Sequence, residues 1–167
     1  QSSGTGGTFN AGAGTYTPAV GATTSTFTYT LTGVAPCIND TSVATININP
    51  QPVAGTDGNT TICDSSVTPI DLFSLITGEQ AGGVWTQTSG TGGTFNAGAG
   101  TFTPALGTTT STFTYTLTGV APCINDASVA TVNINPALNA GADGNTTICD
   151  SSVTPIDLFS LITGEQT

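Results

Sequence analysis

The sequence repeats itself with a period of 86 residues, and this repeat limits the possible folds more than any other feature. Residues 1–80 and 87–166 differ at only ten positions. Identity at this level over so long a period indicates tandem copies of one folding unit. Three of the differences exchange one apolar side chain for another, as buried positions tolerate: Tyr16/Phe102, Val20/Leu106 and Ile46/Val132.

The boundary between two units is expected in the segment from Asn49 to Asn59. This segment is rich in Pro, Gly, Asn and Asp. Four of the ten differences between the copies fall in it, at Gln51, Pro52, Val53 and Thr56. Both features are typical of a linker. It predicts a complete unit at 54–136, preceded by the C-terminal half of one unit (1–53) and followed by the N-terminal half of another (137–167). We expect the sequence to be a window on a longer periodic polypeptide. The alternative is a subunit whose two half-domains complete one another between neighbours.

Short runs with a period of two predict the fold of the complete unit. In residues 111–119 (STFTYTLTG) apolar side chains alternate with threonine, and residues 128–136 alternate in the same way. About seven short strands, each apolar on one face, predict an all-β fold of two antiparallel sheets packed face to face. The other elements expected are strands at 59–64, 83–88 and 101–106, a helical turn or extended run at 69–76, and glycine-rich loop and edge at 88–100.

The charge composition excludes several classes of function. The chain has no Lys, Arg or His and ten acidic residues, which gives a formal net charge of -10. Binding to nucleic acid or anionic lipid depends on cationic side chains, so neither is an expected partner. Without histidine or lysine there is no base to activate a nucleophile and no Schiff base. We therefore expect no enzymatic activity and no cofactor. No apolar run reaches the length needed to insert into a membrane.

The four cysteines allow three pairings. Cys37–Cys63 with Cys123–Cys149 would join neighbouring units, whereas Cys63–Cys123 would lie inside the complete unit. We favour Cys63–Cys123, because a small domain with a thin core needs its own cross-link, worth about 4 kcal/mol for this loop. Cys37 and Cys149 then pair outside the chain, or with each other across a chain boundary. Paired cysteines indicate an oxidising compartment, so we expect an extracellular or cell-surface location.

Other candidate sites have simpler structural interpretations. Asp57 and Asp143 each open an Asp-Gly-Asn turn that could contribute to a calcium site, but the density of ligands is low and turn formation is the favoured role. No metal is expected. Trp85, Phe113 and Tyr115 could form a platform for sugars, but we expect them in the core. The threonine faces could bind ice or glycan, although threonine suits any solvent-facing strand.

Five segments in a defined order carry a resemblance to a known family: TICDSS, IDLFSLITGEQAGGVW, GTGGTFNAGAGTFTPA, STFTYTL and PCINDASVATVNINP. They resemble the immunoglobulin-like repeats of giant Bacteroidota surface adhesins, exported by the type IX route and including gliding-motility adhesins. The resemblance covers the whole chain. It implies immunoglobulin-like sandwiches, a Cys63–Cys123 disulfide in each unit and a domain that opens at Ala54. The second cysteine departs from the usual immunoglobulin pattern, because it follows the strand at 111–119 after a loop.

Two functions are consistent with these features. The first is a structural segment of a long extracellular filament or stalk that holds adhesive regions away from the cell. Its partners would be adjacent identical repeats or neighbouring filament subunits. The second is a multivalent module that binds glycan, ice or a surface through its threonine faces or glycine-rich loops, with avidity from many copies.

Overall fold

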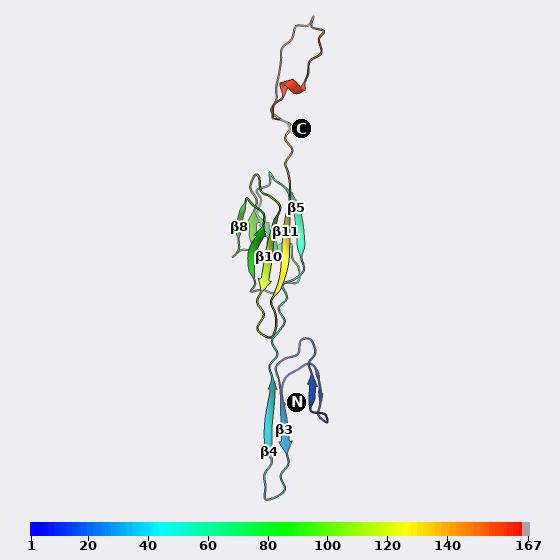
Figure 1. Cartoon of the computed structure of the whole chain (residues 1–167), viewed down its shortest axis with the longest axis vertical. Coiled ribbons are helices and arrows are strands. Elements are labelled where there is room, and N and C mark those ends of the chain that lie inside the picture. Colours follow the sequence, from blue (N-terminus) through cyan, green and yellow to red (C-terminus); the bar gives the residue numbers. More distant parts are fainter. Residues whose placement is uncertain (165–167) are drawn as a thin grey trace.

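The computed structural model describes residues 1–164, and within these residues it contains strands, turns and two single-turn 3-10 helices but no α-helix. Its parts follow one another along one long axis (Figure 1). The strands are β1 (Thr8–Asn10), β2 (Thr15–Thr17), β3 (Ser25–Leu31), β4 (Asp40–Ile46), β5 (Gly58–Cys63), β6 (Ile70–Asp71), β7 (Val84–Ser89), β8 (Thr94–Asn96), β9 (Thr101–Thr103), β10 (Ser111–Leu117) and β11 (Asp126–Asn135). The 3-10 helices are η1 (Leu72–Ser74) and η2 (Phe159–Leu161).

The strands β5 to β11 form two sheets in the middle of the chain. The larger sheet has the order β5-β11-β10-β7 and the smaller has the order β6-β9-β8. The predicted all-β class is confirmed. Every pair is antiparallel except β5 and β11, which run parallel from Gly58 and Ala130 onwards. The purely antiparallel prediction is wrong at this pair, because the whole unit lies between its first and last strands and no hairpin sets their direction.

Two segments differ in detail from the expectation. The range 88–100, expected as loop and edge, contains β8, which pairs with β9. The range 69–76 forms the short strand β6 and then η1, so the two predicted alternatives occur one after the other. Asp71 begins this turn, because its Oδ1 accepts a hydrogen bond from the Phe73 amide at 3.0 Å.

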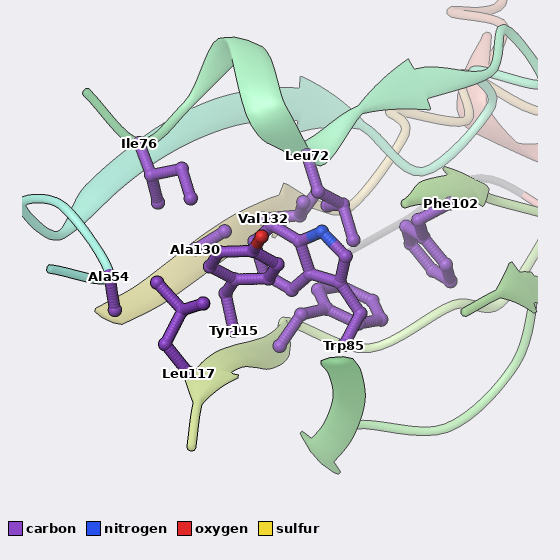
Figure 2. Close-up of a cluster of buried hydrophobic side chains, with 10 residues drawn as sticks. Ala54, Leu72, Ile76, Trp85, Phe102, Tyr115, Leu117, Ala130 and Val132 are labelled. Atoms are coloured by element: carbon purple, nitrogen blue, oxygen red, sulfur yellow. The ribbon is translucent and has the colours of Figure 1, made fainter. Parts of the chain in front are cut away.

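One buried apolar cluster joins the two sheets (Figure 2). Trp85, Phe113 and Tyr115 are 2%, 0% and 1% exposed. The aromatic rings pack closely, with the centroids of Trp85 and Tyr115 5.2 Å apart and those of Phe102 and Phe113 4.8 Å apart. The remaining buried members are Ala54, Leu72, Ile76, Leu117, Ala130 and Val132.

The hydroxyl of Tyr115 ties a loop to this cluster. It donates a hydrogen bond to the Gln80 carbonyl at 2.8 Å and accepts one from the Gly83 amide at 2.8 Å. A Cβ atom on Gly83 would lie 2.5 Å from Cζ of the tyrosine ring, so only glycine allows this approach. The hydroxyl of Tyr115 therefore fixes the end of the segment between η1 and β7, in addition to the buried Ile76 in the same segment.

The residues before and after the central sheets repeat parts of them. The hairpins β1-β2 and β3-β4 have the same registers, shifted by 86 residues, as β8-β9 and β10-β11. Beyond β11, the backbone bridge between Ala142 and Thr163 repeats the bridge between Thr56 and Thr77. Both flanking parts thus keep the local geometry of their counterparts.

The predicted disulfide between Cys63 and Cys123 is wrong. All four cysteines, which lie within the described residues, are free thiols. Cys63 pairs with Asn135 at the last position of β11, whereas Cys123 precedes the first residue of that strand. A strand of this length spans about 30 Å, far beyond the roughly 7 Å that a disulfide allows between Cα atoms. The two cysteines therefore lie at opposite ends of the unit.

Replacement of Tyr115 by phenylalanine tests the anchoring of the loop. We expect Y115F to lower the free energy of unfolding by about 1–2 kcal/mol, because two partly buried backbone groups lose their partner. Urea denaturation followed by the fluorescence of Trp85 measures the change. Tyr29, the same position one repeat earlier, is 67% exposed, so Y29F is the matched control and should leave stability unchanged. Equal effects of the two substitutions would contradict this role.

Candidate functional site

The most unusual surface lies on the N-terminal part, where an apolar sheet face is uncovered. Tyr29 is 67% exposed while its counterpart Tyr115 is 1% exposed. Leu31 is 56% exposed while Leu117 is buried. A hollow of about 450 Å³ opens on this surface, which we call the open face; it is lined by Phe9, Ala11, Gly14, Phe27, Thr28, Tyr29, Ser42, Val43 and Ala44.

The central unit shows what covers the same surface one repeat later. There the counterparts of the open face share one buried cluster with Leu72 and Ile76, from the first third of the unit, and with Trp85 of β7. The aromatic base is unchanged between the two copies, since the ring centroids of Phe9 and Phe27 are 4.8 Å apart and those of Phe95 and Phe113 are 5.0 Å apart. The open face therefore has the same aromatic base as the buried face of the central unit, and no part of residues 1–164 covers it.

The edge of β4 is open in the same way. The last residues of β11, from Ala130 to Asn135, are paired with β5. The strand β4 has the corresponding sequence but ends at Ile46, three residues earlier in the repeat than β11 does. Without a partner, this edge presents backbone donors and acceptors that are free to pair with another strand.

The C-terminal part contains the residues that cover the face in the central unit. Leu158 is 71% exposed, whereas its counterpart Leu72 is 0% exposed. The loop that carries it keeps its shape, since the Ala142 amide donates to the Thr163 carbonyl at 2.8 Å, as Thr56 does to Thr77 at 2.9 Å. The range 144–149 has the same sequence as β5, GNTTIC, but is not a strand here. Each flanking part thus displays half of one core.

Two carboxylates hold β11 to the start of the central unit. Asp57 Oδ1 accepts the Val129 amide at 2.8 Å, and Asp126 Oδ2 accepts the Ala54 amide at 2.8 Å. The structure therefore uses Asp57, one of the two calcium candidates, as a hydrogen-bond acceptor for backbone. Its counterpart Asp143 lies in the C-terminal part, and no group of three metal-binding side chains gathers anywhere in residues 1–164.

The joint between the first two parts is tied by Asn49. The side-chain Nδ2 of Asn49 donates a hydrogen bond to the Ala121 carbonyl at 2.8 Å. The backbone carbonyl oxygen of Asn49 accepts a hydrogen bond from the thiol of Cys123 at 3.3 Å. The loop between β10 and β11 therefore touches the end of the preceding part. Sequence reasoning missed this residue, although its recurrence as Asn135 before the next linker was a usable signal.

Two of the cysteines have activated thiols. The hydroxyl of Ser65 donates to the sulfur of Cys63 at 3.2 Å, and Ser151 does the same for Cys149 at 3.2 Å. In each case this hydrogen bond is the largest cause of a lowered thiol pKa, because it stabilises the thiolate. Both sulfurs are exposed and so accessible to reagents.

The threonines on the outer surface of β7 and β10 bond mainly to one another. The hydroxyls of Thr88 and Thr112 are 2.9 Å apart, and Ser89 reaches the same Thr112 oxygen at 2.7 Å. These groups are cross-strand partners within the sheet. The threonine side chains therefore have a structural use in addition to any surface that they present.

Comparisons of the chain with protein-family models, with curated proteins and with solved structures give no match. Within the described part of the chain, no helix is long and apolar enough to cross a bilayer.

Alkylation kinetics test the activation of Cys63. We expect Ser65→Ala to raise the pKa of the Cys63 thiol, so that its reaction with iodoacetamide slows several-fold near pH 8 and the pH–rate profile moves to higher pH. Mass spectrometry of peptides that extend to Thr56 and Ala142, where the two copies differ, gives the rate for each cysteine. Cys149, with its own serine, is an internal control that should not change. A rate at Cys63 that is unaffected by S65A would contradict the activation.

Proposed function

We propose that this chain is a structural segment of a long extracellular filament or stalk of a bacterial surface adhesin. In this proposal, immunoglobulin-like units follow one another along the axis and hold adhesive regions away from the cell. The observation that carries the proposal is that the open face has the registers of the covered face of the central unit, while the C-terminal part presents the counterparts of residues that cover that face. Complementary surfaces arranged along one axis favour units that follow one another in a single line.

The arrangement of the central strands supports an immunoglobulin-like sandwich. One sheet of four strands and one of three contribute side chains to a single core, and Trp85 is buried at its centre. The first strand of the unit, β5, lies beside the last, β11. An arrangement with a buried tryptophan between two such sheets is typical of this fold class.

We infer that a second copy of the same chain is the partner of the open face. Residues 137–164 of one copy would cover residues 1–53 of the next, as residues 54–81 cover residues 87–136 within one chain. The N-terminal half has the hairpin registers of the central unit, and the C-terminal half has the Ala142–Thr163 bridge that repeats Thr56–Thr77. Residues 144–149 would form their strand on association, which adds an ordering cost.

The central unit identifies the contacts that such a junction would form. Leu158 would occupy the place of the fully buried Leu72, against Phe27 and Tyr29. Burial of each large apolar side chain contributes about 1.5–3 kcal/mol. By the same correspondence, the carboxylate of Asp143 would accept the Val43 amide, as Asp57 accepts that of Val129. Apolar burial and directional hydrogen bonds would act together at the junction.

Composition is consistent with the proposed extracellular role. The net charge of -10 keeps neighbouring filaments apart, and the absence of lysine and arginine leaves no site for trypsin-like proteases. We assign the chain no catalytic role, because its ionisable groups do not include the bases that activate nucleophiles.

Assembly of the purified chain under reducing conditions tests the proposal. We expect sedimentation velocity at about 0.15 M salt, where surface repulsion is screened, to show a concentration-dependent series of oligomers. Electron microscopy should show them as thin lines one unit wide. Leu158→Asp places a charge in the buried junction and should weaken association by at least about tenfold.

Val153→Asp is the matched control for Leu158→Asp. Its counterpart Val67 stays 67% exposed in the central unit, so V153D should assemble like the wild type. The fluorescence of Trp85 should be the same in all three chains, which shows that the central unit remains folded. A wild-type chain that stays monomeric, or equal loss of assembly in L158D and V153D, would overturn the proposed junction.

A further inference from the structure

Cys123 lies at the joint with the preceding part and away from the other cysteines of the chain. Its thiol donates to the Asn49 carbonyl oxygen at 3.3 Å. The amide side chain of Asn49 fixes this contact by donating to the Ala121 carbonyl at 2.8 Å, two residues before the cysteine. The sulfur therefore points at the last residues of the preceding unit.

The other end of the central unit shows what accompanies such an asparagine. Asn135 is the counterpart of Asn49, and it pairs with Cys63 in the register of β11 and β5. The backbone carbonyl oxygen of Asn135 accepts a hydrogen bond at 2.8 Å from the amide of Asp64, the residue that follows Cys63. Wherever a unit is complete, a cysteine of its first strand therefore lies beside the asparagine that ends its last strand.

Completion of the N-terminal part by a second copy would bring these two geometries together. Cys149 of the incoming copy takes the position of Cys63, next to Asn49. The Asn49 carbonyl would then be approached by the thiol of Cys123 at 3.3 Å and by the Asp150 amide at 2.8 Å. Both cysteines would then lie around the same carbonyl oxygen, and such close approach of the two residues is what a disulfide requires.

We propose that consecutive copies are linked by two disulfides, Cys149 of one copy to Cys123 of the next and Cys63 of the first to Cys37 of the next. The second link follows from the same geometry, because Cys37 is the counterpart of Cys123 in the junction unit and faces the end of the central unit before it. This inference rests on the proposed head-to-tail junction. It places one disulfide across the joint at each end of the junction unit.

The proposed pairing accounts for the position of every cysteine. In one chain, Cys63 and Cys123 lie at opposite ends of β11, and all four thiols within the described residues are free. In the proposed assembly, each joint would contain one cysteine from the strand β5 or its counterpart and one from the loop before β11 or its counterpart. The partner of each cysteine is therefore in the adjacent copy, which the pattern of two cysteines per repeat could not show.

Formation of each link requires an oxidant, and a small-molecule disulfide supplies it. The thiolate of Cys149 attacks one sulfur of that disulfide, forms a mixed disulfide and releases the first small thiolate. The thiolate of Cys123 then attacks the protein sulfur and releases the second. One protein disulfide forms, one small disulfide is reduced by two electrons, and the two thiol protons pass to the released thiolates or to solvent. The lowered pKa of Cys149, caused mainly by Ser151, favours it as the first nucleophile.

Mapping the disulfides of the assembled chain tests the inference. The reduced chain is allowed to assemble and is then treated with oxidised glutathione. We expect a ladder of covalent multimers on a non-reducing gel. The chain has no lysine or arginine, so it is digested at acidic residues, and the digestion is limited because 58–64 and 144–150 are identical in sequence. Partially cleaved peptides 41–64 and 127–150 differ in sequence and so identify Cys63 and Cys149 separately. We expect linked pairs that contain Cys123 with Cys149 and Cys37 with Cys63. Linked peptides containing Cys63 with Cys123, or a different dominant pairing, would overturn the inference.

Three variants separate this inference from the junction on which it rests. C149S should retain only the Cys37–Cys63 link, and the double variant C63S/C149S should assemble when reduced but give no ladder. L158D should form neither link. If the reduced wild type assembles but oxidation gives no linked pair, the disulfides are wrong and the junction stands. If the reduced chain does not assemble, both proposals fail.

Discussion

The pairing of β5 with β11 is the interaction on which the central unit depends. A sheet with one apolar face cannot bury that face alone, so residues 87–136 need the segment that precedes them. The parallel ladder from Gly58 to Cys63 attaches this segment, and the buried cluster under it joins the two sheets. Where the ladder is missing, at β4, the strand is shorter and the same tyrosine is 67% exposed instead of 1%. Local sequence forms the hairpins, but the first strand completes the core.

The repeat separates what sequence can predict from what it cannot. Alternation predicted the strands at 111–119 and 128–136 correctly, because a period of two reports which face is apolar. It could not report the pairing partner. The sequence GNTTIC is a strand at 58–63, where it pairs with β11, but it is not a strand at 144–149, where the described residues offer no strand to pair with. The short strand β8 was missed because glycines surround it. The Cys63–Cys123 disulfide was wrong because spacing along the chain does not show at which end of a strand a cysteine lies.

Carboxylates in this chain act through backbone amides instead of cations. With no Lys, Arg or His, an acidic side chain has no side-chain ion pair to form, and Asp57, Asp71 and Asp126 each accept a backbone N–H at 2.8–3.0 Å. Such charge-assisted bonds are stronger than neutral ones. The calcium interpretation of Asp57 came from the residue types in the Asp-Gly-Asn turn. Those residue types do not show that the carboxylate already accepts a hydrogen bond from the Val129 amide. Asn49, which is central to the joint, gave no chemical signal at all beyond its recurrence.

The direction of β5 beside β11 also decides how a unit responds to pulling. The chain enters the unit near the first residue of β5 and leaves it after the last residue of β11, at opposite ends of the same ladder (Figure 1). Tension along the axis therefore draws the two strands past each other in shear. The backbone hydrogen bonds of six aligned residue pairs resist this shear together. In a hairpin pulled apart at its open end, by contrast, the pairs break one after another. A filament of copies that associate without covalent links would separate at the junction between copies before a central unit shears, unless disulfides bridge that junction.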